Sequence, residues 1–180
     1  MINKEWPVKM TSYDFSEKTV LITGGTKGIG YAVAMAFARC HANVVISGRN
    51  QEDCDRKASE ICAPGGRAKG IRADVRKVED IKRLVRETVA CFGSVDILVN
   101  CAGIAATKKI VDLEEEDYDN VMDTNLKSVL FASKEAAKEM IQSQRGGKII
   151  QMASIGGLKG NNGLSVYGAS KAADMGSTCG

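Results

Sequence analysis

A glycine-rich turn between a strand-like run and a helix-like run constrains this chain more than any other feature. Residues 23–30 read Thr-Gly-Gly-Thr-Lys-Gly-Ile-Gly; they follow an apolar run at 19–22 and precede a helical pattern at 32–38. Glycines let the backbone bend and come close to a ligand, and the free N–H groups at the start of a helix attract an anion. The turn therefore predicts a phosphate site, with contacts from Gly24, Thr26, Lys27, Gly28, Ile29 and Gly30.

The spacing of the glycines narrows the kind of phosphate site. Gly24, Gly28 and Gly30 follow a Gly-x3-Gly-x-Gly pattern. A P-loop would end in Gly-Lys-Ser/Thr, and the common dinucleotide fingerprint would read Gly-x-Gly-x-x-Gly, so neither pattern is met. From this motif alone, a tight strand–helix turn without a ligand remains the alternative.

Strand and helix patterns alternate along the rest of the chain. Residues 78–92 have apolar side chains at helical spacing, whereas residues 95–100 form an almost continuous apolar run. Strands without polar alternation are buried on both faces, and their alternation with helices predicts a single α/β domain with a doubly wound parallel sheet of the Rossmann type. Ligands of such sheets bind at the carboxyl ends of the strands. The expected strands are 18–23, 44–47, 68–72, 95–100 and 148–152, and the expected helices are 29–39, 51–62, 78–92 and 118–140.

The end of the second expected strand bears on the choice of nucleotide. A dinucleotide with a free ribose 2′-hydroxyl prefers a carboxylate there, but Arg49 stands at this position and Lys27 lies in the glycine turn. Two cations near the adenosine ribose suit a 2′-phosphate, which favours NADP over NAD. The alternative is that both are solvated surface cations.

The next two strand ends offer further contacts. Asp74, followed by Val75, could accept a hydrogen bond from an adenine amino group or could cap the next helix, and the pattern leaves both readings open. The fourth expected strand ends in Asn100, with Ala102 and Gly103 just beyond it. These small residues would let a cofactor lie against the backbone, or would only satisfy the packing of the loop.

Three polar side chains farther along the chain could carry proton chemistry. Ser154 follows the fifth expected strand, and Tyr167 and Lys171 are four residues apart, which places them on one face of a helix if they share one. A phenol has a pKa of about 10, too high for acid–base work near neutrality, and a nearby ammonium lowers it. The serine hydroxyl could polarise a carbonyl across the pocket. The Tyr-x3-Lys spacing alone proves little, because it can arise by chance.

Taken in order, these motifs resemble the short-chain dehydrogenase/reductase family, in the style of its 3-oxoacyl-carrier-protein reductase-like members. The resemblance covers residues 18–171. It implies hydride transfer between NADP(H), or less readily NAD(H), and a small-molecule carbonyl/alcohol substrate, with no metal. The residues that carry it are the glycine turn, Asp74, the motif at 100–103, Asn125, Ser154, Tyr167 and Lys171.

The resemblance also implies a role for each catalytic residue. Tyr167 would donate a proton to the carbonyl, and Ser154 would orient the substrate oxygen. Lys171 would lower the pKa of Tyr167 and hold the ribose hydroxyls, so that Tyr167 and Lys171 would also contact the cofactor. Asn125 would hold a water that relays protons to Lys171, or would only be a polar residue that bends a long helix.

The chain departs from the family pattern in several places. Cys101 stands where the family usually has a second asparagine, and His41 replaces a common glycine at the end of a helix. Asp174 and Ser177 occupy helix positions that are normally apolar. The sequence stops nine residues after Lys171, whereas the family usually continues with two further strands and the substrate lid.

These departures set the expected domain organisation. Residues 1–17 form an N-terminal extension, and residues 18–180 form an oxidoreductase domain that lacks its last two strands. The fifth strand would then be an uncovered edge. The resemblance implies a homo-oligomer for a full-length form, with a weakened subunit interface in this chain. The alternative function is a non-catalytic nucleotide-binding or interaction fragment.

Composition excludes several other classes of protein. The net charge of +3 is too small to favour nucleic acid or a membrane surface as a partner, and no apolar run approaches the roughly 18 residues of a membrane span. The single histidine, His41, argues against a Ser-His-Asp triad and a histidine-rich metal site, and is expected to be a helix C-cap. The six scattered cysteines are expected to be reduced and mostly buried. We therefore expect a cytoplasmic protein.

Overall fold

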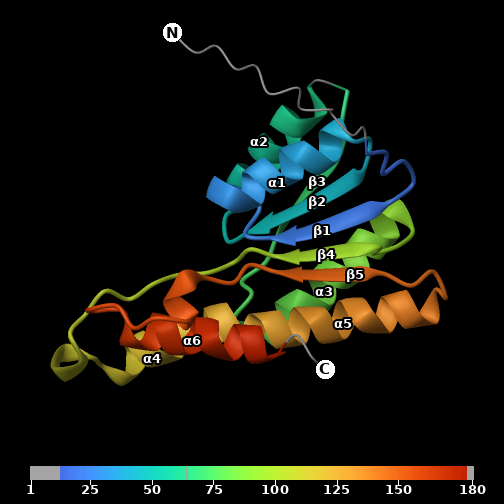
Figure 1. The fold of residues 1–180 in the computed structure, drawn as a ribbon. Helices are drawn as coiled ribbons and strands as arrows, with labels where there is room; N and C mark the ends of the chain where they lie inside the picture. Colours follow the sequence, from blue (N-terminus) through green and yellow to red (C-terminus); the bar gives the residue numbers. More distant parts are fainter. Residues whose placement is uncertain (1–12, 64, 178–180) are drawn as a thin grey trace, which may run out of the picture.

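The central element of the structure is a five-stranded parallel sheet with the strand order β3-β2-β1-β4-β5 (Figure 1). The computed structural model describes residues 13–63 and 65–177. The strands are β1 (Thr19–Thr23), β2 (Asn43–Gly48), β3 (Arg67–Arg72), β4 (Ile97–Asn100) and β5 (Lys148–Gln151). The predicted α/β class and all five predicted strands are confirmed.

Helices connect consecutive strands, as parallel pairing requires. Those observed are α1 (Gly28–Arg39), α2 (Gln51–Cys62), α3 (Val78–Phe92), α4 (Glu115–Met122), α5 (Ser128–Gln142) and α6 (Ser165–Gly176), with short 3₁₀ turns η1 (Ile110–Asp112) and η3 (Ile155–Gly157). The long helix expected over residues 118–140 is α4 and α5 joined without a break by a π-helical segment, η2 (Asp123–Lys127). Sequence periodicity gave the helix but not the π segment within it.

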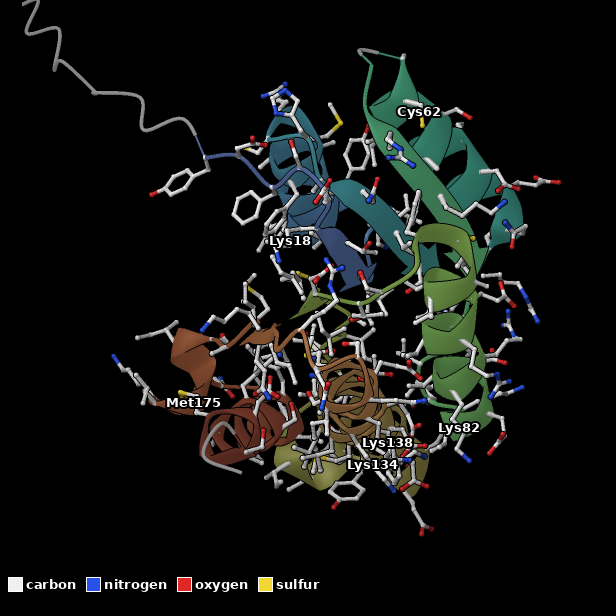
Figure 2. All side chains as sticks on the ribbon, turned by 90° about the vertical axis from the view of Figure 1, so that its right-hand side faces the viewer. Lys18, Cys62, Lys82, Lys134, Lys138 and Met175 are labelled. Carbon is white, nitrogen blue, oxygen red and sulfur yellow. The ribbon has the colours of Figure 1, made fainter. Side chains whose placement is uncertain are left out.

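The helices form two layers, one on each face of the sheet (Figure 1). Val20 and Ile22 of β1 belong to the apolar cluster that contains residues of α1 and α2, whereas Leu21 belongs to the cluster formed with α3 and α5. Neighbouring side chains of a strand point to opposite faces, so both faces of the central strands are covered. This explains why the strand sequences are almost continuously apolar. Lys82 on α3 and Lys134 and Lys138 on α5 lie on the outer surface of the second layer (Figure 2).

The strand order places a crevice at the carboxyl end of the sheet. β1 pairs with β2 on one side and with β4 on the other. The connections after β1 and β4 therefore leave the sheet in opposite directions, and ligands of doubly wound folds bind at this switch point. The glycine turn follows β1, so the fold brings it to the predicted place.

β5 forms one edge of the sheet, as expected from the sequence. It pairs only with β4, with Leu98 opposite Ile149 and Val99 opposite Ile150. Ile149 is 37% exposed and Ile150 is 43% exposed, although their partners on β4 are fully buried. The apolar side chains of this edge are therefore incompletely covered by the residues that the structure describes.

At the opposite end of the sheet, a buried carboxylate ties β1 to β4. Asp96 Oδ2 accepts hydrogen bonds from Thr19 N at 2.9 Å and from Ser94 Oγ at 2.7 Å. Asp96 Oδ1 accepts from Arg145 Nε at 3.2 Å, and its side chain is only 5% exposed. These contacts fix the amino ends of the two strands whose carboxyl ends frame the crevice.

The C-cap of α1 differs by one residue from the expected position. Cys40, not His41, is the C-cap of α1; His41 is the next residue and adopts the left-handed conformation (φ 69°) that usually favours glycine.

Of the five cysteines within the described ranges only Cys54 is fully buried, so the expectation of mostly buried thiols is wrong. Residues 1–12 of the expected N-terminal extension lie outside the described residues, and Phe15 packs against Phe37 of α1. In the described ranges, no helix combines the length and apolarity needed to cross a membrane.

Candidate active site

A cleft of about 490 Å³ lies at the carboxyl ends of β1 to β4. Its lining comes from the glycine turn and from the loops that follow β2, β3 and β4. The predicted cofactor contacts that line it are Gly24, Thr26, Lys27, Gly28, Ile29, Gly30, Arg49, Asp74, Val75, Ala102 and Gly103. The fold therefore brings eleven separately predicted residues to one cavity.

The glycines of the turn are required by its geometry. Gly24 has φ 68° and Gly28 has φ 55°, both in the left-handed region. A Cβ on Gly24 would lie 2.8 Å from the Ala102 Cα, and a Cβ on Gly30 would overlap the carbonyl oxygen of Gly24. A Cβ on Gly28 would meet nothing within 4 Å. The turn thus packs closely against the β4 loop and leaves open space at Gly28.

The start of α1 is suited to an anion. Its first turn contains no acidic residue, and its N-cap, Lys27, makes no capping bond with its side chain to the part of the chain that is described. By contrast, Asn50 caps α2 and accepts a hydrogen bond from Asp53 N at 3.1 Å. Among the residues that the structure describes, the first-turn N–H groups of α1 therefore have no side-chain acceptor, so they can bind phosphate oxygens.

The charged side chains around the cleft are not equally available. Within residues 13–63 and 65–177, Lys27 and Arg49 form no ion pair or side-chain hydrogen bond. The two carboxylates that line the cleft are both paired: Asp53 with Arg56 at 2.7 Å, and Asp74 with Arg76 at 2.7 Å. The cleft can therefore offer two free cations to a ligand, while its acidic groups are already neutralised.

Asp74 does not cap a helix, so that reading of the sequence is wrong. The N-cap of α3 is Lys77. Asp74 instead binds the Arg76 guanidinium and the Arg76 backbone N–H, and these bonds hold the pKa of its carboxyl below the ordinary value. Arg76 also donates to Asn120 Oδ1 on α4 at 2.8 Å. Sequence reasoning missed Arg76; its only signal was an arginine two residues after Asp74.

The loop after β4 is held by Thr23, the last residue of β1. Thr23 Oγ1 accepts from the backbone N–H groups of Cys101 at 3.2 Å and Ala102 at 3.3 Å. Asn100 is buried in β4, where Nδ2 donates to Ser133 Oγ at 3.2 Å. Its side chain therefore anchors α5 to the sheet; its contact with a cofactor stays a prediction.

Ser154 and Tyr167 both lie close to Gly156. Ser154 Oγ accepts from Gly156 N at 3.1 Å. A Cβ on Gly156 would lie 3.2 Å from Tyr167 Cε1 and 3.3 Å from Ser154 Oγ. The serine after β5 and the tyrosine of α6, thirteen residues apart in sequence, are thus brought together around Gly156.

Asn125 lies in the π segment and is fully buried. Its Oδ1 accepts from Ile104 N at 2.9 Å, and its Nδ2 donates to Ile104 O at 2.9 Å and to Ser170 Oγ at 3.0 Å. The side chain therefore joins the β4 loop to α6. The expected proton relay through a water stays a prediction.

Lys171 is buried beneath the end of β5. Its Nζ donates to the Met152 carbonyl at 2.7 Å and pairs with Asp174 Oδ2 at 3.0 Å. Burial raises the pKa of the nearby Cys101 thiol, and the Lys171 ammonium partly opposes that effect. Lys171 thus lies close to the β4 loop that forms one wall of the cleft.

Known proteins are similar to this chain in sequence and in fold. The family model described as short chain dehydrogenase matches residues 18–179. The chain belongs to the short chain dehydrogenase family. The 3-oxoacyl-[acyl-carrier-protein] reductase FabG of Staphylococcus epidermidis is 38% identical over 162 residues, which are 89% of this chain and 66% of that protein.

One further relative and one solved structure are also similar to most of this chain. The 2-dehydro-3-deoxy-D-gluconate 5-dehydrogenase of Escherichia coli K12 is 36% identical over 169 residues, or 94% of this chain and 66% of that protein. A solved dehydrogenase/reductase from Sinorhizobium meliloti 1021 matches with a TM-score of 0.86 and 38% identity, over 94% of this chain and 67% of that chain. The chain therefore spans about two thirds of the length of these relatives.

Proposed function

We propose that the chain is the cofactor-binding and catalytic part of an oxidoreductase that transfers a hydride between NADP(H) and a carbonyl/alcohol substrate. The observation that carries this proposal is the cleft at the end of the sheet, with an uncapped helix start and two cations, Lys27 and Arg49, that are unpaired within the described ranges. The names of the relatives, a 3-oxoacyl reductase and a gluconate-type dehydrogenase, support a carbonyl/alcohol pair. They do not choose between substrates.

The residues of the cleft fit a phosphorylated dinucleotide. The N–H groups at Gly28 and its neighbours would hold the pyrophosphate, since glycine leaves room there for a ligand. Lys27 and Arg49 would bind the ribose 2′-phosphate. Asp74 and Val75 would contact the adenine, and Ala102 and Gly103 would lie against the nicotinamide half.

The bound dinucleotide would supply the hydride acceptor or donor. Tyr167 would give a proton to the carbonyl oxygen or take one from the alcohol, and Ser154 would orient that oxygen by a hydrogen bond. Lys171 would stabilise the ionised phenol and bind ribose hydroxyls. The side chains of Ser154 and Tyr167 both approach the position that a Cβ on Gly156 would take, which supports their acting on one substrate atom.

A non-catalytic role in nucleotide binding is the second candidate. The observation that favours it is that the Lys171 ammonium is already engaged by Asp174 and Met152. Tight NADPH binding with no turnover of any ketone or alcohol would support this second function.

We further propose a cytoplasmic location and self-association as a homo-oligomer.

Titration of the purified chain with NADPH and NADH, followed by nucleotide fluorescence, tests the cofactor proposal. One charge-assisted contact to the 2′-phosphate should favour NADPH by roughly ten- to a hundredfold. Arg49→Asp should reverse the preference, because a carboxylate accepts from a free 2′-hydroxyl and repels a phosphate. Arg86→Asp makes the same charge change on the exposed surface of α3 and should leave the preference intact. Equal affinities, or tighter NADH binding by the unaltered chain, would contradict the proposal.

A further inference from the structure

The last turn of α6 contains a buried charge that the proposed chemistry does not use. Asp174 is 1% exposed, and its Oδ2 lies 3.0 Å from Lys171 Nζ, one helical turn earlier. The Lys171 side chain is itself only 7% exposed. Both members of the pair are therefore almost completely removed from water. Opposite charges attract each other more strongly in the protein interior than in water.

The carboxylate depends on Lys171 for its charge balance. Its second oxygen, Asp174 Oδ1, is buried and has no hydrogen-bond partner among the residues that the structure describes. The Ser177 hydroxyl, which could have served, donates instead to the Asp174 backbone carbonyl and to Gln151. The Met175 side chain, from the next residue of α6, reaches Gly157: a Cβ there would lie 2.8 Å from Met175 Cε.

The surroundings of Lys171 supply few other charges. The β5 end presents the Met152 carbonyl, and the β4 loop presents the Cys101 thiol. Asn125 of the π segment is neutral and donates to Ser170, the residue before Lys171. Among the described contacts of the ammonium, Asp174 is the one carboxylate, so it is the group that offsets the charge of Lys171 there.

We propose that Asp174 is a positioning residue that holds the Lys171 ammonium against the Met152 carbonyl and offsets its charge. The inference rests on the proposed pairing of Tyr167 with Lys171. In that pairing, a lone ammonium would favour the ionised phenol. With a carboxylate 3.0 Å from that ammonium, the pair carries no net charge, and the phenol is stabilised less. Asp174 thereby restrains the chemistry of Tyr167 and fixes where the ammonium lies.

Ultraviolet difference absorption of tyrosinate, recorded through an alkaline titration of the whole chain, tests this inference without requiring turnover. The chain has four tyrosines, so the Tyr167 signal is obtained by subtracting the titration of the matching Tyr167→Phe protein. Asp174→Asn keeps the size and one oxygen acceptor but removes the charge. On the proposed Tyr167–Lys171 pairing, the uncompensated ammonium should move the Tyr167 signal to lower pH than in the unaltered chain. Asp112→Asn removes an equal charge from the exposed surface and should not move it.

Two comparisons separate this inference from the proposed function. A Tyr167 titration that is unchanged in Asp174→Asn, but that moves to higher pH in Lys171→Met, overturns the role of Asp174 and keeps the Tyr–Lys pairing. A titration that does not move in Lys171→Met overturns the pairing itself. If circular dichroism shows that Asp174→Asn does not fold, Asp174→Val replaces it, because valine also removes the charge. Asp174→Val should give the same shift of the Tyr167 signal to lower pH. If the Asp174→Val protein shows no such shift, the inference is overturned.

Discussion

The carboxylate that ties β1 to β4 should make this fold sensitive to acid. Burial alone would raise the pKa of Asp96, but the hydrogen bonds from Thr19 N and Ser94 Oγ and the charge of Arg145 outweigh burial and hold the pKa below its ordinary value. A carboxylate with a lowered pKa in the folded state stabilises the protein above the pKa of the unfolded chain, about 3.9. That stabilisation is lost as the pH falls through the lower, folded-state pKa.

The magnitude follows from the contacts that Asp96→Asn would remove. The asparagine oxygen can take the place of Oδ2 and keep the bonds from Thr19 N and Ser94 Oγ, but these bonds then lose their charged acceptor. Its amide donor takes the place of Oδ1 and faces the Arg145 guanidinium, which is itself a donor. A hydrogen bond to a charged acceptor contributes about 1.5–3 kcal/mol, so we expect a loss of about 2 kcal/mol at neutral pH. For a domain of this size that corresponds to a Tm lower by roughly 4–8 °C.

Thermal unfolding of both proteins between about pH 7 and about pH 3 checks this reasoning. The difference in Tm should be largest at neutral pH and should shrink under acid conditions, because protonated Asp96 resembles asparagine. Glu79→Gln is the control: this carboxylate pairs with Lys82 at 2.7 Å but is 80% exposed, and exposed pairs stabilise little. A difference that is absent at neutral pH, or that stays constant through the acid range, would show that Asp96 does not act through its charge.

Two further changes test the glycine turn and the proposed proton donor. Gly30→Ala places a methyl group against the Gly24 carbonyl oxygen, so it should destabilise the fold by about 1–3 kcal/mol in denaturant unfolding and abolish nucleotide binding. The control is Gly160→Ala, whose methyl group would meet nothing within 4 Å. This control should change neither the free energy of unfolding nor nucleotide binding. Tyr167→Phe should retain NADPH binding but lower ketone-dependent NADPH oxidation by about a hundredfold or more. Near-normal turnover would exclude Tyr167 as the donor, and the exposed Tyr118→Phe serves as its control.

The sequence allowed the fold to be predicted because its local and global signals agree. The apolar runs that became β1 and β4 lack polar alternation, and the glycine turn lies between a strand and a helix. A parallel sheet brings the carboxyl ends of such strands together whatever the loops between them do. Most of the predicted nucleotide contacts therefore converged on one cleft.

Other features depend on partners that are distant in sequence and could not be predicted. Asp74 could equally have capped a helix, and the outcome was decided by Arg76 and its contact with Asn120 on α4. The π segment around Asn125 has no periodicity of its own, because one extra residue in a turn leaves both flanking helices unchanged. Asn125 is held there by the backbone of Ile104, 21 residues earlier in the chain.

The Lys171–Asp174 pair shows why stability alone cannot reveal what a buried charge does. Removing one partner from a buried pair typically costs about 3–5 kcal/mol, whether or not the pair has a function, because the other charge is left without compensation. Replacing both partners by apolar residues is often neutral or stabilising, so the pair is not explained by a need for stability. The sequence could flag Asp174 only as a polar residue on a face that is normally apolar. Its effect on the titration of Tyr167 is therefore the measurement that distinguishes a positioning role from mere tolerance of a buried acid.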